Sequence, residues 1–238
     1  GYLLDPGYIY YGQHTYSDRF TDKMVELLGR KPRLHAEEIT EWHEDLAFAV
    51  QKNLEDAVER LILWAIRETG VNNICIGGGV GLNIKMNSRM FQLPDISDVF
   101  AHPLCNDAGT AVGAALAACF QTTNKRPEIL STLALGPDES DDKIEHTLKL
   151  ANIKYEKPID ICEAVAEELV NGRIIGWFQG RMEAGPRALG QRSILADPRF
   201  VENRDKVNDI IKFREYWRPF CPSIIEEAME KYFEEYTE

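Results

Sequence analysis

Two glycine-rich turns, each lying between a strand-like and a helix-like segment, limit the fold of this sequence more than any other feature. Residues 72–76 are short and apolar, which predicts a buried strand, and the turn Gly77–Asn83 that follows has four glycines in five positions. Residues 98–102 predict a second strand, after which the turn Pro103–Asp107 leads into a small-residue helix that starts at Gly109. This alternation of helices and strands predicts an α/β fold.

Apolar residues at three- and four-residue spacing predict the helices around these strands. The longest helix starts near Glu44 and ends before Gly70, and residues 84–92 predict a short helix between the two strands. The chain before this long helix is rich in turns, and we expect loops there with one helix around residues 18–28.

A second unit is predicted in the C-terminal half. Residues 143–151 and 161–170 predict helices, with Asp160 as the N-cap of the second one, and residues 173–178 predict a strand. Residues 226–238 predict an acidic amphipathic helix without a terminating signal, and the chain starts without Met. We therefore expect a central piece of a longer protein.

The charge distribution argues against general nucleic-acid binding, which needs a basic surface. The net charge is −12 at pH 7. Residues 173–218 nevertheless hold ten Arg or Lys residues against six Asp or Glu, a local balance of +4. Such a basic island suits a small anionic ligand, although a surface helix with ordinary ion pairs explains the charge equally well.

Further patterns bear on location and on metal binding. No apolar run approaches the ~20 residues of a membrane span, and no secretory signal opens the chain. The five cysteines are far apart and form no C-x-x-C pair, which predicts reduced, mostly buried thiols in a cytoplasmic protein rather than a zinc site. The five histidines show no metal-ligand spacing, and His43 is expected at the surface or as a helix cap.

The first glycine turn is a candidate phosphate site. The backbone amides of Gly77, Gly78 and Gly79 can approach a ligand closely, and the N-terminus of the following helix favours an anion. The turn is neither a P-loop nor a G-x-G-x-x-G dinucleotide motif. A tight structural turn explains the same glycines.

The second turn is a candidate metal and nucleotide site. Asp107 can cap the following helix or bind a metal ion. Gly109 and Gly113 lie four residues apart on one helix face, which leaves a smooth surface for backbone or nucleotide packing. Two such corners are typical of the nucleotide cleft of actin-like and sugar-kinase-like ATPases, where each would face the ligand from one side.

The loop Gly180–Ser193 is a candidate anion site. It carries Arg181, Arg187 and Arg192 among three glycines and a proline, and arginine suits bidentate binding of phosphate or carboxylate oxygens. Glu183 can pair with one arginine but cannot neutralise all three. The basic island extends through four further polar residues, Lys212, Arg214, Arg218 and Ser223. The aromatic residues among them are expected in the core rather than as a nucleobase platform, namely Phe213, Trp217 and Phe220.

Read in order, these segments resemble the O-carbamoyltransferase family of nodulation proteins and antibiotic biosynthesis. The resemblance covers nearly the whole chain, and the arginine loop is its most specific part. It is carried by residues 43–51, 77–83, 106–114, 135–137, 180–193, 197–199 and 217–220.

The resemblance implies the domain organisation. Residues 1–125 would be the C-terminal half of an actin-like (ASKHA-type) ATPase domain that binds nucleotide and metal. Residues 126–150 would connect it to residues 151–238, the N-terminal part of a YrdC-like α/β domain that forms carbamoyl adenylate.

The resemblance also implies the reaction and the roles of the site residues. ATP and carbamoyl phosphate would give carbamoyl adenylate, which donates its carbamoyl group to a hydroxyl of a small-molecule acceptor. Arg181, Arg187, Arg192 and Ser193 would hold carbamoyl phosphate or the adenylate. Asp107 would be a ligand of a divalent metal ion, with iron expected. The nucleotide pocket would be lined by Gly77, Gly78, Gly79, Asn83, Gly109 and Gly113.

Departures from the family pattern leave alternatives open. The family's metal site also needs an H-x-x-x-H motif, which this sequence lacks, so the isolated chain is expected to be inactive. An actin-like kinase would not need the arginine loop, and a hydrogenase-maturation enzyme would carry a zinc-finger cysteine pattern. A catalytically dead binding or scaffold module is the third alternative. The acceptor and the oligomeric state are not readable from the sequence.

Overall fold

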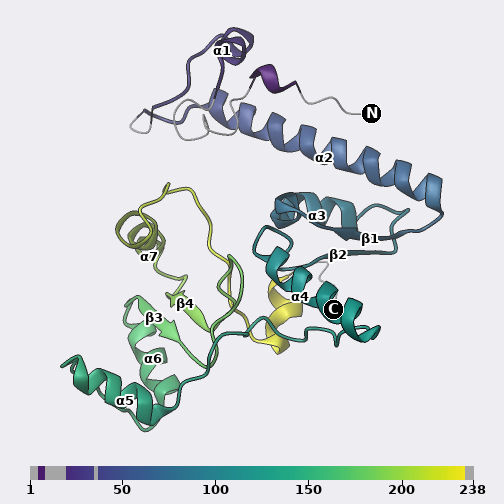
Figure 1. Ribbon diagram of the computed structural model, residues 1–238. Helices are drawn as coiled ribbons and strands as arrows, with labels where there is room; N and C mark the ends of the chain where they lie inside the picture. The colour runs from purple at the N-terminus through teal and green to yellow at the C-terminus, as the bar shows by residue number, and fades with distance from the viewer. Residues whose placement is uncertain (1–4, 9–19, 35–36, 234–238) are drawn as a thin grey trace. The chain divides into compact units, whose positions relative to one another are not determined.

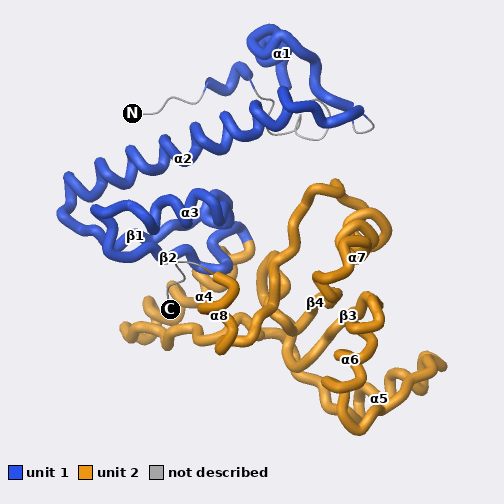
Figure 2. Tube along the Cα trace, turned by 180° about the vertical axis from the view of Figure 1, so that it is seen from behind, with its two compact units in different colours: residues 1–107 blue, residues 108–238 orange. Residues whose placement is uncertain are grey.

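The computed structural model describes residues 5–8, 20–34 and 37–233 (Figure 1). The chain forms two compact units, residues 1–107 and residues 108–238 (Figure 2). Each unit combines helices with a two-stranded sheet, so the predicted α/β class is confirmed. The predicted domain boundaries at residues 125 and 150 stay a prediction.

The first unit consists of helices and one parallel strand pair. In chain order its elements are the 3-10 helix η1 (Pro6–Tyr8), α1 (Asp22–Leu28), α2 (Glu41–Thr69), β1 (Asn73–Ile76), the 3-10 helix η3 (Gly79–Leu82), α3 (Ile84–Phe91) and β2 (Asp98–Ala101). The part of the predicted 18–28 helix before residue 20 lies outside the described residues.

Helix α2 shows how local sequence sets a helix boundary. It begins at Glu41, three residues before the expected start at Glu44, because Thr40 and His43 form a capping box. The Nδ1 atom of His43 accepts a hydrogen bond from the backbone N–H of Thr40 at 3.1 Å, so the predicted capping role of His43 is confirmed. Gly70 ends the helix in the left-handed region with φ of 69°, as predicted.

The core of the first unit joins α2 and α3 to the sheet. Ile62 of α2 is buried together with Met86 and Met90 of α3. Half-buried apolar residues surround this cluster: Leu54, Val58, Ile66, Ile74, Ile76, Leu93, Ile96 and Val99. Strands β1 and β2 pair in parallel, with Asn73 opposite Asp98, and α3 lies in the connection between them. The turns that follow the two strands therefore leave the same edge of the sheet.

The second unit contains more helices and one antiparallel strand pair. Its elements are α4 (Gly109–Thr123), α5 (Asp141–Leu150), α6 (Ile161–Val170), β3 (Ile175–Phe178), β4 (Arg192–Leu195), α7 (Val201–Lys206), the π-helix η4 (Val207–Ile211), the 3-10 helix η5 (Glu226–Ala228) and α8 (Met229–Tyr232). Asp160 caps α6, as predicted, by accepting hydrogen bonds from the backbone N–H groups of Cys162 and Glu163.

Several sequence expectations differ from the structure of this unit. Strand β4 begins at Arg192, inside the segment 180–193 that was expected to be a loop, because its residues pair with β3. The predicted helix over residues 226–238 is short, since Phe233 is extended; residues 234–238 lie outside the described part.

Two properties of the described chain concern its surface. The expected burial of the cysteines is wrong, because the strand and helix faces that carry Cys75, Cys119 and Cys162 are uncovered and Cys221 lies in an exposed loop. Cys105 is half-buried. Among the described helices, none is both long and apolar enough to cross a membrane.

The core of the first unit predicts a position-dependent loss of stability along α3. Met90→Ala removes a side chain with 0% exposure and should lower the free energy of unfolding by about 2–5 kcal/mol. Ile84→Ala on the same helix truncates a side chain that is 77% exposed and should change it by less than about 0.5 kcal/mol. Urea unfolding followed by circular dichroism measures both, and equal losses would contradict the placement of the core.

Candidate functional site

The two turns at the carboxyl edge of the parallel pair lie against each other. Gly81 of the first turn is buried, and a Cβ atom added there would lie 2.9 Å from the Sγ atom of Cys105 in the second turn. Gly78 needs glycine for another reason, since its φ of 88° is one that side chains rarely adopt. By contrast, a Cβ atom at Gly77 or Gly79 would meet nothing within 4 Å.

Asn83 closes the first turn by capping α3. Its Oδ1 atom accepts a hydrogen bond from the backbone N–H of Met86 at 3.0 Å. Its Nδ2 atom donates to Oε1 of Gln51 on α2 at 2.8 Å. Asn83 therefore caps α3 and links it to α2. Its place in a nucleotide pocket stays a prediction.

Two buried amide oxygens beside these turns were missed by sequence reasoning. Asn87 donates from Nδ2 to the carbonyl oxygen of Gly81 at 2.8 Å, which fixes the orientation of its amide. The Oδ1 atoms of Asn87 and of Asn106 are both buried, and neither finds a hydrogen-bond partner in the described part of the chain. Buried carbonyl oxygens normally accept a hydrogen bond, so each of these two atoms can still accept one from a ligand or a water molecule. No sequence pattern distinguishes Asn87 from a helix-surface residue, whereas Asn106 opens the segment 106–114 that carries part of the family resemblance.

Asp107 does not act as the N-cap of helix α4. That position is held by Ala108, and the side chain of Asp107 is exposed. Within the described ranges, no group of three or more His, Cys, Asp or Glu side chains could hold a metal ion. The described residues therefore form no complete metal centre by themselves. Gly109 and Gly113 lie on α4 in the second unit, where Gly113 is exposed and its missing Cβ atom would meet no neighbour.

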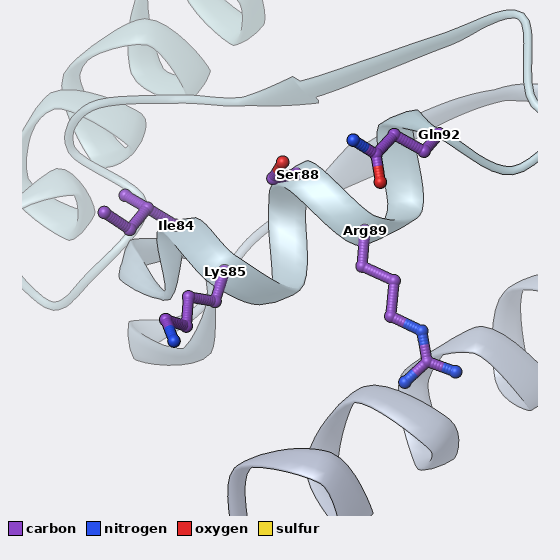
Figure 3. Close-up of a pocket in the computed structure, with 5 residues that line it drawn as sticks. All are labelled: Ile84, Lys85, Ser88, Arg89 and Gln92. Atoms are coloured by element: carbon purple, nitrogen blue, oxygen red, sulfur yellow. The ribbon is translucent and has the colours of Figure 1, made fainter. Parts of the chain in front are cut away.

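A shallow hollow of about 420 Å³ lies on one face of α3 (Figure 3). Its lining residues are Ile84, Lys85, Ser88, Arg89 and Gln92. Figure 3 shows Arg89 extending from α3 toward a neighbouring helix, and its partners are carboxylates of α2. Nη1 lies 3.3 Å from Glu55 and Nη2 lies 2.6 Å from Asp56, with Glu59 also in contact. Arg89 therefore joins α2 to α3, and its charge is balanced by the carboxylates of α2.

The arginine loop of the second unit is built around Glu183, which is 4% exposed. Its Oε1 atom accepts hydrogen bonds from the backbone N–H groups of Leu189 and Gln191, both at 2.8 Å, and of Arg192 at 3.2 Å. Its Oε2 atom accepts from Nε of Arg192 at 2.9 Å, and Nη2 of Arg192 donates to the carbonyl oxygen of Glu183. The predicted pairing of Glu183 with one arginine is thereby confirmed, and the partner is Arg192.

Glu183 is ionised over a wide pH range. Burial raises the pKa of its carboxyl group, but the hydrogen bonds from Arg192 and from the backbone N–H groups of Leu189 and Gln191 outweigh burial. The balance lowers the pKa of Glu183 from 4.5 to about 2.

The remaining predicted residues of the loop differ in their contacts. Nε of Arg181 donates to the carbonyl oxygen of Gly136 at 2.7 Å, a neutral acceptor that leaves the guanidinium charge unbalanced. Arg187 is exposed, and no described residue pairs with its guanidinium group. Ser193 lies in β4, opposite Trp177 of β3. The sheet therefore fixes the backbone at Ser193, whereas Arg187 stands in the open part of the loop.

Sequence reasoning also missed an ion pair between a buried carboxylate and an exposed arginine directly after β4. Asp197 is 8% exposed, and its carboxylate accepts hydrogen bonds from both Nε and Nη2 of Arg199. The bonds to the side chain and backbone of Arg199 lower the pKa of Asp197.

The loop after η4 is organised by buried Asn208. This side chain donates to the carbonyl oxygens of Tyr216 and Arg218 and accepts from Nε of Arg214 at 2.6 Å. The guanidinium group of Arg214 lies 4.6 Å from the centre of the Phe220 ring. The expectation that the aromatic residues here form core is wrong, because the Asn208 contacts fix the backbone and leave them outside: Phe213 is 84%, Trp217 53% and Phe220 41% exposed.

Comparison with known proteins adds to this geometry. The family models for the carbamoyltransferase N-terminus and C-terminus match residues 10–116 and 166–238. Nodulation protein NolO of Bradyrhizobium diazoefficiens is 36% identical over 98% of this chain and 42% of its own length. The 3'-hydroxymethylcephem-O-carbamoyltransferase of Streptomyces clavuligerus is 38% identical over 67% of this chain and 29% of its own length. The chain spans less than half the length of these relatives.

The buried carboxylate predicts a specific acid sensitivity. Because the pKa of Glu183 is depressed, its contribution to stability is present above pH 4.5 and is lost as the pH falls toward about 2. Glu183→Gln should therefore lower the free energy of unfolding at pH 6 by on the order of 3 kcal/mol and have little effect near pH 2. Urea unfolding of both proteins at several pH values measures the difference, and a pH-independent difference would contradict the assignment.

Proposed function

The chain belongs to the carbamoyltransferase family, and we propose that it supplies part of an ATP-dependent O-carbamoyltransferase. Carbamoyl phosphate would be activated as carbamoyl adenylate, and the carbamoyl group would then pass to a hydroxyl of a small molecule. The family match and the O-carbamoyltransferase relative support this proposal. The actin-like ATPase domain, residues 1–125, and the YrdC-like domain, residues 151–238, are part of the proposal.

The observation that carries the proposal is the unequal use of the three arginines in the loop. Arg192 is neutralised by Glu183, whereas Arg187 is exposed and Arg181 donates to a neutral carbonyl oxygen, with no ion pair in the described part of the chain. Two guanidinium groups are thus available to a small anion on a loop that is already folded. Guanidinium groups match the oxygen geometry of phosphate and are suited to bidentate contacts.

The chemistry requires this positive charge. Carbamoyl phosphate, ATP and one water would give carbamoyl adenylate, pyrophosphate and phosphate. The acceptor hydroxyl oxygen would then attack the carbamoyl carbon, AMP would leave, and the hydroxyl proton would pass to solvent. The first step brings two phosphorylated anions together, and fixed guanidinium groups offset their repulsion and the charge that develops in the transition state.

The glycine turn of the first unit is the proposed ATP-binding element. Gly77 and Gly79 have open space where a side chain would stand, which leaves room for a phosphate beside their backbone. The buried oxygen atoms of Asn87 and Asn106 can accept hydrogen bonds from a polar ligand that enters beside the turn. Gly109, Gly113 and Asp107 keep their proposed roles toward nucleotide and metal, but no step of the reaction is derived through the metal.

Removal of Arg187 should abolish most of the activation step. In the full-length polypeptide that carries this sequence, AMP should form from ATP only when carbamoyl phosphate and an acceptor are present. Arg187→Ala should lower kcat/KM for carbamoyl phosphate by roughly 100-fold, because one positioned donor to developing charge is lost. A coupled assay for AMP measures the rate.

Arg204→Ala is the matched control, since Arg204 is an exposed arginine of the same unit that pairs with Asp205. It should leave the rate unchanged. Release of ADP with a sugar would instead identify a kinase, and the absence of turnover in the full-length protein would identify an inactive binding or scaffold module. Either result would overturn the proposed function.

A further inference from the structure

The segment 184–192 is a closed arch whose ends are fixed. The backbone N–H of Ala184 donates to the carbonyl oxygen of Leu133 at 2.7 Å. The backbone N–H of Gln179 donates to the carbonyl oxygen of Gln191 at 2.9 Å. Gly185 and Gly190 have φ values of 97° and 108°, which allow the chain to turn at both corners. The arch therefore has a defined shape before any ligand binds.

The inside of the arch is filled by the carboxylate of Glu183. Backbone N–H groups that converge on one point form a ready-made site for an external anion. Three such groups, those of Leu189, Gln191 and Arg192, converge here on Oε1 of Glu183. A substrate anion cannot use these donors while Glu183 holds them, so it has to be bound from outside the arch by side chains.

The same carboxylate decides which arginine faces outward. Arg192 turns back to Glu183 with both Nε and Nη2, and its side chain is 35% exposed. Arg187 lies midway along the arch and is exposed, with no ion pair in the described part of the chain. Glu183 thus holds the backbone that follows Arg187, and no hydrogen bond of the described chain joins its carboxylate to the Arg187 side chain.

We infer that Glu183 is a positioning residue for carbamoyl phosphate, because it holds Arg192 inside the arch and presents Arg187 at its outer side. The inference rests on the proposed function. Glu183 does not contact the substrate in this arrangement and acts through Arg187. Arg192, in turn, supports the arch and is not the arginine that meets the substrate.

A double-mutant cycle on the full-length polypeptide tests this coupling, with the dissociation constant for carbamoyl phosphate measured by isothermal titration. Glu183→Gln keeps the side-chain size and removes the charge, and it should weaken binding by about tenfold, as expected for one lost oriented contact. Arg187→Ala should weaken binding at least as much. The double variant should be no weaker than Arg187→Ala alone, because residues that act through each other are not additive.

A readout of folding separates positioning from stability. Asp197→Asn removes another buried carboxylate of the same unit, whose partner is Arg199, and should lower stability without changing the dissociation constant. Arg192→Lys keeps Glu183 and a positive charge but cannot make both contacts of Arg192 with Glu183, so it should weaken binding about as much as Glu183→Gln and add nothing to the loss in Arg187→Ala.

Four outcomes would overturn the inference. Additive losses in the cycle, or an unchanged dissociation constant in Glu183→Gln, would remove the positioning role and leave the proposed function intact. A further loss when Arg192→Lys is combined with Arg187→Ala would make Arg192 a direct ligand. Failure of the unsubstituted protein to bind carbamoyl phosphate would remove the proposed function together with the inference.

Discussion

The arginine loop depends on one buried charge, the carboxylate of Glu183. A buried carboxylate is costly unless it is paired and hydrogen-bonded, and here three backbone N–H groups and Arg192 meet that requirement. The same requirement also determines the conformation of the loop. Because the charge has to be surrounded by donors, the chain between Glu183 and Arg192 has to bend around it, and the bend sets where the loop's remaining side chains point.

The first unit shows a different constraint, which comes from strand direction. A parallel pair places the turns after both strands at the same edge of the sheet, and ligands of open α/β sheets commonly bind at that edge. The contact between Gly81 and Cys105 follows from this arrangement, since a side chain at residue 81 would collide with the sulfur atom. Packing therefore explains Gly81, and the backbone angle explains Gly78. Neither reason applies to Gly77 and Gly79.

Local patterns predicted the elements whose signals are contained in a few adjacent residues. The Gly70 stop of α2 and the Asp160 cap of α6 are such signals, and both are seen in the structure. Strand β4 was not predicted, because its partner β3 lies elsewhere in the chain and its own four residues carry no distinctive pattern. The exposed position of Phe213 was missed for a related reason: it depends on the buried contacts of Asn208, which no local count of apolar residues reveals.

The basic island illustrates why charge counted along a sequence overstates the charge offered to a ligand. Several of its arginines are paired with carboxylates of the same unit: Arg173 with Glu168, Arg192 with Glu183, Arg199 with Asp197, Arg204 with Asp205 and Arg218 with Glu215. Exposed pairs of this kind are weak, and their members can exchange partners. Arg192 and Arg199 cannot exchange partners in this way, because the buried carboxylates of Glu183 and Asp197 would then be left without a counter-charge. Anion binding by the loop therefore depends less on the total of +4 than on which guanidinium group the buried carboxylate leaves outside.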